Sequence, residues 1–306
     1  MTATLELRAG AARVVLAPKA GGSIAAYEWR DRAVLRPAPA DGLARGEVRD
    51  FASYPLVPFS NRIANATLHW LGAAYPLPRY LRGHPHAIHG NGWQRAWDLV
   101  ERAPSGATLE LKHDAAGARA LEWPFPYRAR QSFALVEDSL TLTHAIENTG
   151  ATAFPFGLGW HPFFPRTDAT LLQFRAASVW LTDATQLPTR RESVPPQWDF
   201  SSARPIGDTT LDHCFAGWQP PASVRWPERG LGVSIEADAA CGHLVVYVPR
   251  GADQLAIEPV THMTDAFNRA AAGKVDTGTR VLAPGETFSC TMRLSVSPLS
   301  DDAPGA

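Results

Sequence analysis

One acidic residue, Glu258, follows an apolar run and precedes a proline in the stretch QLAIEPVTHMTDAFN at 254–268. Burying a carboxylate is costly unless the group is paired or used chemically. Two aromatic segments punctuated by glycine supply candidate partners, HAIHGNGW around His89 and GLGWHPFF around His161. A carboxylate beside an imidazole can perform general acid-base catalysis. These residues predict an acid-base site, with a structural salt bridge as the alternative role for Glu258.

Short strands are the elements that must position these side chains. Apolar and polar residues alternate from Phe288 to Ser297, which predicts a half-buried strand. The segments 132–136 and 139–146 are separated by two residues and predict a hairpin. Further runs of this kind lie at 12–16, 107–112, 128–135, 232–237 and 243–248. No segment has the pattern of a long amphipathic helix, so the chain is predicted to be all-β, with sandwich and barrel both open.

The composition predicts one large domain. The chain has 306 residues, of which 45% are hydrophobic, enough to bury a sizeable core without metals or disulfides. No internal repeat and no break in composition divides residues 1–297. The last residues, 298–306, are predicted to be a disordered tail.

The net charge indicates the kind of ligand, and the cysteine content indicates whether disulfides or a zinc site are expected. The formal net charge is −1 and the arginines are scattered, which argues against nucleic acid or an anionic membrane and favours a small neutral ligand. The three cysteines have no CxxC spacing, so reduced thiols are expected rather than a disulfide framework or a zinc site. With no signal-peptide pattern, we expect a cytoplasmic protein. We also expect a monomer or a homodimer.

Three further stretches accompany the segments around His89, His161 and Glu258 along the chain: YPLVPFSNRI, LDHCFAGW and VYVPRG. Together they resemble the aldose 1-epimerase (sugar mutarotase) family, from about residue 21 to residue 294. The resemblance implies a large antiparallel β-sandwich of the galactose mutarotase-like type. It also implies interconversion of the α and β anomers of free aldoses by ring opening and reclosure, with no cofactor and no metal.

The same resemblance assigns roles to the acid-base residues. Glu258 corresponds to the base and His161 to the acid, while His89 contacts the ring oxygen beside His161. The apolar residues before Glu258 would partly desolvate its carboxylate and raise its proton affinity, as a base requires. The division of work between the two histidines stays open.

Hydrogen-bonding side chains for a sugar come from two other motifs. Asn61 and Arg62 supply donors and Asp212 supplies an acceptor, and sugar hydroxyls need both kinds. The resemblance assigns Arg62 and Asp212 to substrate hydroxyls, with a structural ion pair between them as the alternative. Three tryptophans are candidates for stacking on the sugar, with core packing as the alternative: Trp160, Trp93 and Trp218. Trp160 is the principal one.

Two positions depart from the family pattern. Val260 stands where members that prefer galactose carry a glutamine, so Thr261 or His262 is expected to supply the hydrogen bond instead. Ala66 stands where a glycine often follows the NRI motif. Both changes leave Glu258 and His161 in place.

Two alternative functions remain. A hexose 6-phosphate 1-epimerase would need a cluster of arginines for the phosphate, and Arg79, Arg82 and Arg95 flank the His89 loop. A non-catalytic carbohydrate-binding or sensing domain would keep the pocket without the reaction. The spacing of His84, His86 and His89 suggests a metal cluster, but no carboxylate or cysteine completes it, so no metal is predicted.

Overall fold

Alternating burial along the strands produces a large sheet with one covered face. The computed structural model describes residues 3–299. In β27 (Thr287–Pro298), Cys290, Met292 and Leu294 are buried, as the alternation predicted. The predicted hairpin is confirmed as β12 (Tyr127–Val136) and β13 (Ser139–Asn148), paired up to Val136 and Ser139.

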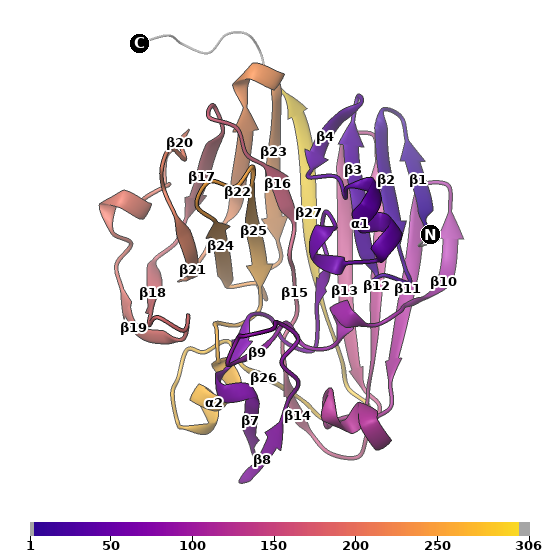
Figure 1. The fold of residues 1–306 in the computed structure, drawn as a ribbon, viewed down its shortest axis with the longest axis vertical. Coiled ribbons are helices and arrows are strands. Elements are labelled where there is room, and N and C mark those ends of the chain that lie inside the picture. The colour runs from indigo at the N-terminus through magenta and orange to yellow at the C-terminus, as the bar shows by residue number, and fades with distance from the viewer. Residues whose placement is uncertain (1–2, 300–306) are drawn as a thin grey trace.

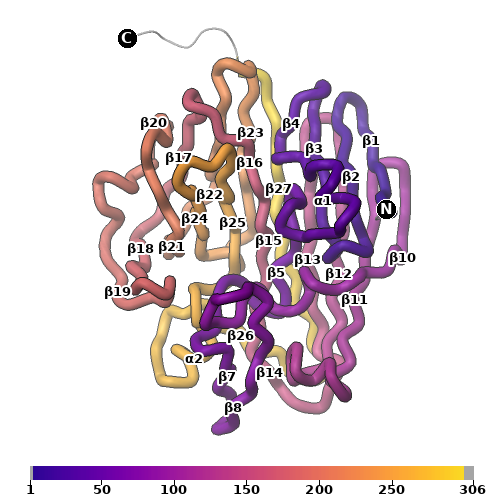
Figure 2. Tube along the Cα trace, in the orientation of Figure 1, coloured from indigo at the N-terminus to yellow at the C-terminus, as the bar shows by residue number. Residues whose placement is uncertain are grey.

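The large sheet has nine strands. β27 lies in its middle, between β13 and β23, so the end of the chain joins its two halves (Figure 2). In spatial order the strands are β10 (Asp98–Ala103), β11 (Gly106–His113), β12, β13, β27, β23 (Leu231–Ala237), β22 (Gln219–Trp226), β17 (Leu171–Arg175) and β20 (Arg204–Pro205).

A second sheet of eight strands carries the predicted acid-base residues. Its order is β19 (Pro188–Glu192), β18 (Ser178–Thr182), β21 (Leu211–Ala216), β24 (His243–Val248), β25 (Gln254–Val260), β15 (Gly159–Trp160) and β5 (Pro55–Leu56), and β16 (Phe163–Pro165) also pairs with β25.

Smaller sheets, two short α-helices and several 3₁₀ turns make up the rest of the described residues (Figure 1). The four-stranded sheet comprises β1 (Leu5–Ala9), β2 (Ala12–Ala17), β3 (Ser23–Trp29) and β4 (Arg32–Leu35). The two-stranded pairs are β14 (Phe154–Phe156) with β26 (Arg280–Leu282), β6 (Arg62–Ile63) with β9 (Ala87–Ile88), and β7 (Thr67–Trp70) with β8 (Ala73–Pro76). The helices are α1 (Ala40–Arg45) and α2 (Ala266–Ala271).

The core lies between the nine-stranded sheet and the two sheets that cover it. His144 of β13 packs on Trp160 of the eight-stranded sheet, with ring centroids 5.7 Å apart. Gln131, opposite His144 on β12, donates to the Gly22 carbonyl beside the four-stranded sheet. The eight-stranded sheet and the four-stranded sheet therefore cover the same face of the nine-stranded sheet. This is the antiparallel β-sandwich that was predicted.

The structure bears on the predicted tail at 298–306 and on membrane-spanning helices. Pro298 belongs to β27 and the Leu299 amide donates to the Gly230 carbonyl, while the rest of the predicted tail lies outside the described residues. Within residues 3–299, no helix is long and apolar enough to cross a membrane.

Candidate active site

Strand pairing brings the predicted acid and base together. β25 pairs with β15 at Val260 and with β16 at Ala256, which puts His161 opposite Glu258, between the two. His161 Nε2 lies 3.2 Å from Glu258 Oε1. Side chains that face each other across neighbouring strands lie on the same face of a sheet. The two residues are therefore held together by the backbone pairing of the sheet.

Burial shifts the pKa values of Glu258 and His161 in opposite directions. Burial, reinforced by the nearby Asp212 carboxylate, raises the pKa of Glu258 well above its ordinary value. Burial lowers the pKa of the His161 imidazole to about 3. Glu258 Oε2 and His161 Nδ1 are buried without a hydrogen-bond partner among the described residues. The pair thus has buried polar atoms available to a ligand.

His89 is fixed with its ring in a defined tautomer. The Asn61 amide donates to His89 Nδ1 at 3.1 Å, and the His89 amide donates to the Asn61 carbonyl at 2.9 Å. Because Nδ1 accepts a hydrogen bond, the proton of the neutral imidazole lies on Nε2. Burial and the neighbouring His161 hold the pKa of His89 well below its ordinary value. The ring, with its centroid 5.4 Å from that of His161, is a fixed neutral donor.

The glycines that follow His89 allow the loop to pack against Val57, which follows strand β5. A Cβ on Gly90 would lie 2.3 Å from the Val57 carbonyl oxygen, and one on Gly92 would lie 2.3 Å from Val57 Cγ1. Gly90 also has a φ of 69°, a conformation that favours glycine. These two glycines therefore allow the backbone of the His89 loop to approach Val57 closely.

Arg62 and Asp212 form the ion pair considered in the sequence analysis. Arg62 Nη2 lies 3.1 Å from Asp212 Oδ2, and Arg62 Nη1 donates to Asn61 Oδ1 at 3.0 Å. The pair joins strand β6, which carries Arg62, to strand β21, which carries Asp212. Each guanidinium has five donors and each carboxylate about four acceptor positions, so both groups retain capacity for a ligand.

These side chains line one cavity of about 320 Å³. Every predicted site residue except Trp160 contributes to it: Asn61, Arg62, His89, His161, Asp212 and Glu258. The remaining lining residues are Arg49, Tyr54, Leu81, Ile88, Phe163, Val245, Tyr247 and Gln254. Residues distant in the sequence thus form a single polar pocket with aromatic walls.

The structure does not bring Trp160 to this cavity. Trp160 is adjacent to His161 in the sequence, and adjacent strand residues point to opposite faces of a sheet. Its side chain packs on His144 in the core and is 1% exposed. Trp93 and Trp218 are also buried and are not lining residues. For these tryptophans the structure shows the core packing that the sequence analysis had left as the alternative.

Comparison with known proteins assigns the chain to a family. A profile described as "Aldose 1-epimerase" matches residues 3–295. The chain belongs to the aldose 1-epimerase family. The uncharacterized protein YphB of Escherichia coli (strain K12) is 32% identical over 285 residues, which cover 90% of this chain and 93% of YphB.

Solved structures share the fold of this aldose 1-epimerase family member. A protein of Escherichia coli K12, provisionally named an aldose 1-epimerase, is 28% identical with a TM-score of 0.87, over 97% of this chain and 99% of its own. A galactose mutarotase-like protein from Clostridium acetobutylicum is 17% identical with a TM-score of 0.84, over 97% and 95% of the two chains. The second likeness shows the fold alone.

Thr261 and His262, expected to replace a missing glutamine in this family member, have structural contacts instead. His262 Nε2 accepts from the Ser60 amide at 3.1 Å, and its Nδ1 lies 2.7 Å from the Met263 carbonyl. Thr261 Oγ1 accepts from the Leu158 amide at 2.9 Å. Both side chains are buried and absent from the cavity lining. That expectation was wrong because both side chains bind backbone groups of neighbouring loops.

The arginines proposed for a phosphate do not line the cavity of this aldose 1-epimerase family member, although Leu81, next to Arg82 in the sequence, does. The lining includes none of Arg79, Arg82 and Arg95. Arg95 pairs with Glu122 at 2.8 Å. Within residues 3–299, no group of three or more His, Cys, Asp or Glu side chains is placed to hold a metal ion.

Tyr54 is a site residue that sequence reasoning missed. Its ring lies 4.7 Å from that of His161 and 6.0 Å from that of His89, and it stacks on Trp93 at 5.5 Å. It begins the quoted stretch YPLVPFSNRI, and Tyr247 lies in VYVPRG, so the motifs contained the signal. Which side chain of a motif faces the pocket depends on strand register.

Proposed function

We propose that the protein is an aldose 1-epimerase, or mutarotase, that interconverts the α and β anomers of a free monosaccharide. The observation that carries the proposal is the buried pair of His161 and Glu258, 3.2 Å apart in a cavity of about 320 Å³. This volume is at the small end of the roughly 300–1,000 Å³ typical of ligand sites, which favours a single sugar. Family membership supports the same reaction class.

Glu258 acts as the base in the proposed reaction. Its Oε2 takes the proton of the anomeric hydroxyl, C1 and O1 form a carbonyl, and the bond from C1 to O5 breaks. His161 gives a proton to O5 as this bond breaks. The open aldehyde turns about the bond from C1 to C2 and recloses on its other face. Both protons then return, so the site ends as it began.

The shifted pKa values suit a pair that carries one proton. With the proton on Glu258 the pair is neutral, which burial favours, since the pKa of Glu258 is raised and that of His161 is lowered. Moving that proton to His161 gives the carboxylate and the imidazolium that ring opening needs. No proton has to enter from solvent during the cycle.

The neighbouring groups position the sugar in this proposal. His89 donates from Nε2 to the ring oxygen, because its Nδ1 already accepts the Asn61 amide. Arg62 and Asp212 supply a donor and an acceptor for ring hydroxyls. This divides the work of the two histidines: His89 holds the oxygen and His161 transfers the proton.

Exchange-spectroscopy NMR of anomer interconversion tests the proposal. The wild-type protein should accelerate interconversion of free aldoses above the spontaneous rate, and Glu258→Gln should lower kcat at least about 10²-fold, the low end of typical acid-base contributions. Sugar binding by the variant should persist, because the amide keeps the size of the side chain. Sugar binding by the wild-type protein without acceleration would instead support a carbohydrate-binding or sensing domain.

The same panel should include 6-phosphorylated aldoses. The absence of Arg79, Arg82 and Arg95 from the lining favours free sugars over the hexose 6-phosphate alternative. Acceleration confined to phosphorylated sugars would reverse that choice.

A further inference from the structure

The cavity continues along β25 beyond the acid-base pair. Gln254, Ala256 and Glu258 alternate along this strand, so all three face the same side of the sheet. At about 3.4 Å per residue, the Cα atoms of Gln254 and Glu258 are about 14 Å apart. Ala256, which lies between them, has the shortest side chain of the three. Gln254 therefore lies at the end of the cavity remote from the reacting carbon.

The cross-strand neighbours of Ala256 show which residues line the cavity between the acid-base pair and Gln254. Phe163, two residues beyond His161 along the chain, pairs with Ala256, and Tyr247 pairs with Ala256 from the other side. Phe163 and Tyr247 both line the cavity. A sugar with O5 at His161 and C1 at Glu258 would extend its next ring carbon and that carbon's substituent past Phe163, toward Gln254.

Gln254 has an unused acceptor at this place. Its Oε1 is buried and has no hydrogen-bond partner among the described residues. A buried polar atom without a partner is unfavourable unless a ligand or water supplies a hydrogen bond. Whichever way the amide is turned, it presents a donor and an acceptor, which matches a hydroxyl group.

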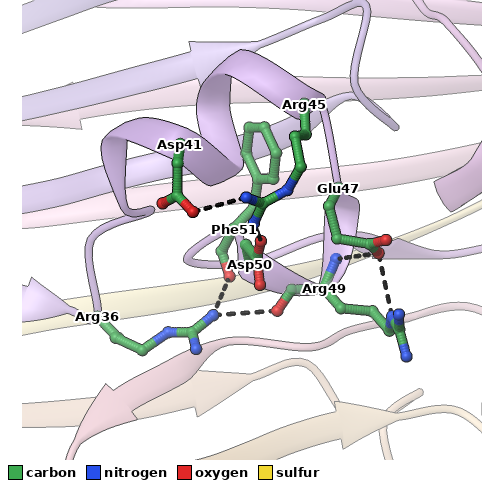
Figure 3. A network of polar contacts seen from close by, with 7 residues as sticks. All are labelled: Arg36, Asp41, Arg45, Glu47, Arg49, Asp50 and Phe51. Atoms are coloured by element: carbon green, nitrogen blue, oxygen red, sulfur yellow. Dashed lines mark hydrogen bonds and ion pairs between the residues drawn. The ribbon is translucent and has the colours of Figure 1, made fainter.

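Arg49 reaches the same cavity from a different part of the chain. Figure 3 shows the network that holds it: Arg36 Nη2 donates to the carbonyls of Arg49 and Phe51, both at 3.1 Å. Arg36 is itself anchored at the Phe163 end, where its amide donates to the Phe163 carbonyl and its guanidinium lies 4.9 Å above the ring. Arg49 is thus positioned on this side of the pocket.

The charge of Arg49 is already balanced. Its Nε donates to Glu47 Oε1 at 3.0 Å, which leaves its terminal nitrogens as donors beside a neighbouring negative charge (Figure 3). Gln254 is neutral. A neutral hydroxyl matches these two side chains better than a phosphate or a carboxylate, which would place a second anion near Glu47.

We propose that Gln254 and Arg49 select aldohexoses by binding the primary hydroxyl on the exocyclic carbon, C6. The inference rests on the proposed function, since it takes the position of C1 from Glu258. Aldopentoses of the same ring stereochemistry lack this group and leave the amide of Gln254 unpartnered. The preference for a hexose should be about tenfold, the contribution of roughly one hydrogen bond.

The test compares glucose with xylose, and galactose with L-arabinose, which differ by the exocyclic group. Dissociation constants from NMR titration and kcat/KM from exchange spectroscopy are measured for wild-type protein and for Gln254→Met, which keeps the volume and removes both polar atoms. The hexose-to-pentose ratio should fall about tenfold toward one in this variant and also in Arg49→Ala. An unchanged ratio of dissociation constants in both variants overturns the proposal.

Arg45→Ala is the matched control for Arg49→Ala. Arg45 belongs to the same surface network, bonded to Asp41 and Asp50, but does not line the cavity (Figure 3). Its removal should leave the ratio intact. Tighter binding of glucose 6-phosphate than of glucose, lost in Arg49→Ala, would overturn the choice of a neutral group. Hexose-selective binding without catalysis would refute the mutarotase function and retain the specificity site.

Discussion

His161 and Glu258 face each other across neighbouring strands, with Nε2 of one 3.2 Å from Oε1 of the other. The backbone pairing on both sides of the contact fixes its geometry, so little movement is needed before proton transfer. Asp212 and Arg62 lie close enough to influence the proton affinity of Glu258 in opposite directions.

The pH dependence of kcat/KM should report a pair that shares one proton. Activity should fall in acid near pH 3, where His161, with its pKa of about 3, accepts a second proton. It should fall in alkali at a pH well above 4.5, where the raised pKa of Glu258 is passed and the pair loses its proton. Exchange NMR, with the spontaneous rate subtracted at each pH, measures both limbs. A single step near pH 6.5, typical of an exposed histidine, would contradict a shared proton.

Asp212→Asn and Arg62→Gln should move the alkaline limb in opposite directions. The Asp212 carboxylate raises the pKa of Glu258 and the Arg62 guanidinium lowers it. The limb should therefore shift to lower pH in the first variant and to higher pH in the second. Both variants should also raise KM several-fold, since each removes a candidate partner for a sugar hydroxyl. Shifts in the same direction would show that another group determines the limb.

Glu258→Gln should stabilise the folded protein, increasingly so as pH rises. The unfolded carboxyl loses its proton near pH 4.3, whereas burial makes the folded one hold it to higher pH. The wild-type protein therefore loses stability from about pH 4.3 up to the folded pKa, by about 1.4 kcal/mol per pH unit of separation, and the amide does not. Thermal unfolding at pH 4 and pH 7 compares the two proteins. A difference in Tm that is independent of pH would mean that Glu258 is not desolvated.

Tyr54 should act by positioning both histidines. Its ring contacts His161 at 4.7 Å and His89 at 6.0 Å, so Tyr54→Leu should lower kcat about tenfold by loosening the imidazoles. Tyr54→Phe keeps the ring and should retain several-fold more activity than Tyr54→Leu. The NMR signals of the two imidazoles should broaden or shift in the leucine variant. Equal losses in both variants would assign the effect to the hydroxyl group instead.

Much of the fold was readable from local patterns. The alternation along residues 288–296 and the two-residue spacing between β12 and β13 predicted strands that the structure contains. Burial on one face of a sheet imposes a period of two on the sequence, so these elements leave a local trace. The alternation in the sequence therefore predicts which residues of these strands face the core and which face outward.

The sequence also determined which side chains are chemically unusual. Glu258 follows an apolar run, and the histidines lie among aromatic residues, so their types and neighbours predicted desolvated acid-base groups before any contact was known. The lining of the cavity by His89, His161 and Glu258 agrees with that prediction.

Only the tertiary structure decided which residues face one another. The neighbours Trp160 and His161 enter opposite sides of a sheet, the first into the core and the second into the cavity. Arg49 and Gln254 lie about two hundred positions apart in the sequence, yet both line one pocket. Strand register and loop packing arise from contacts between distant segments. No local pattern in the sequence records them.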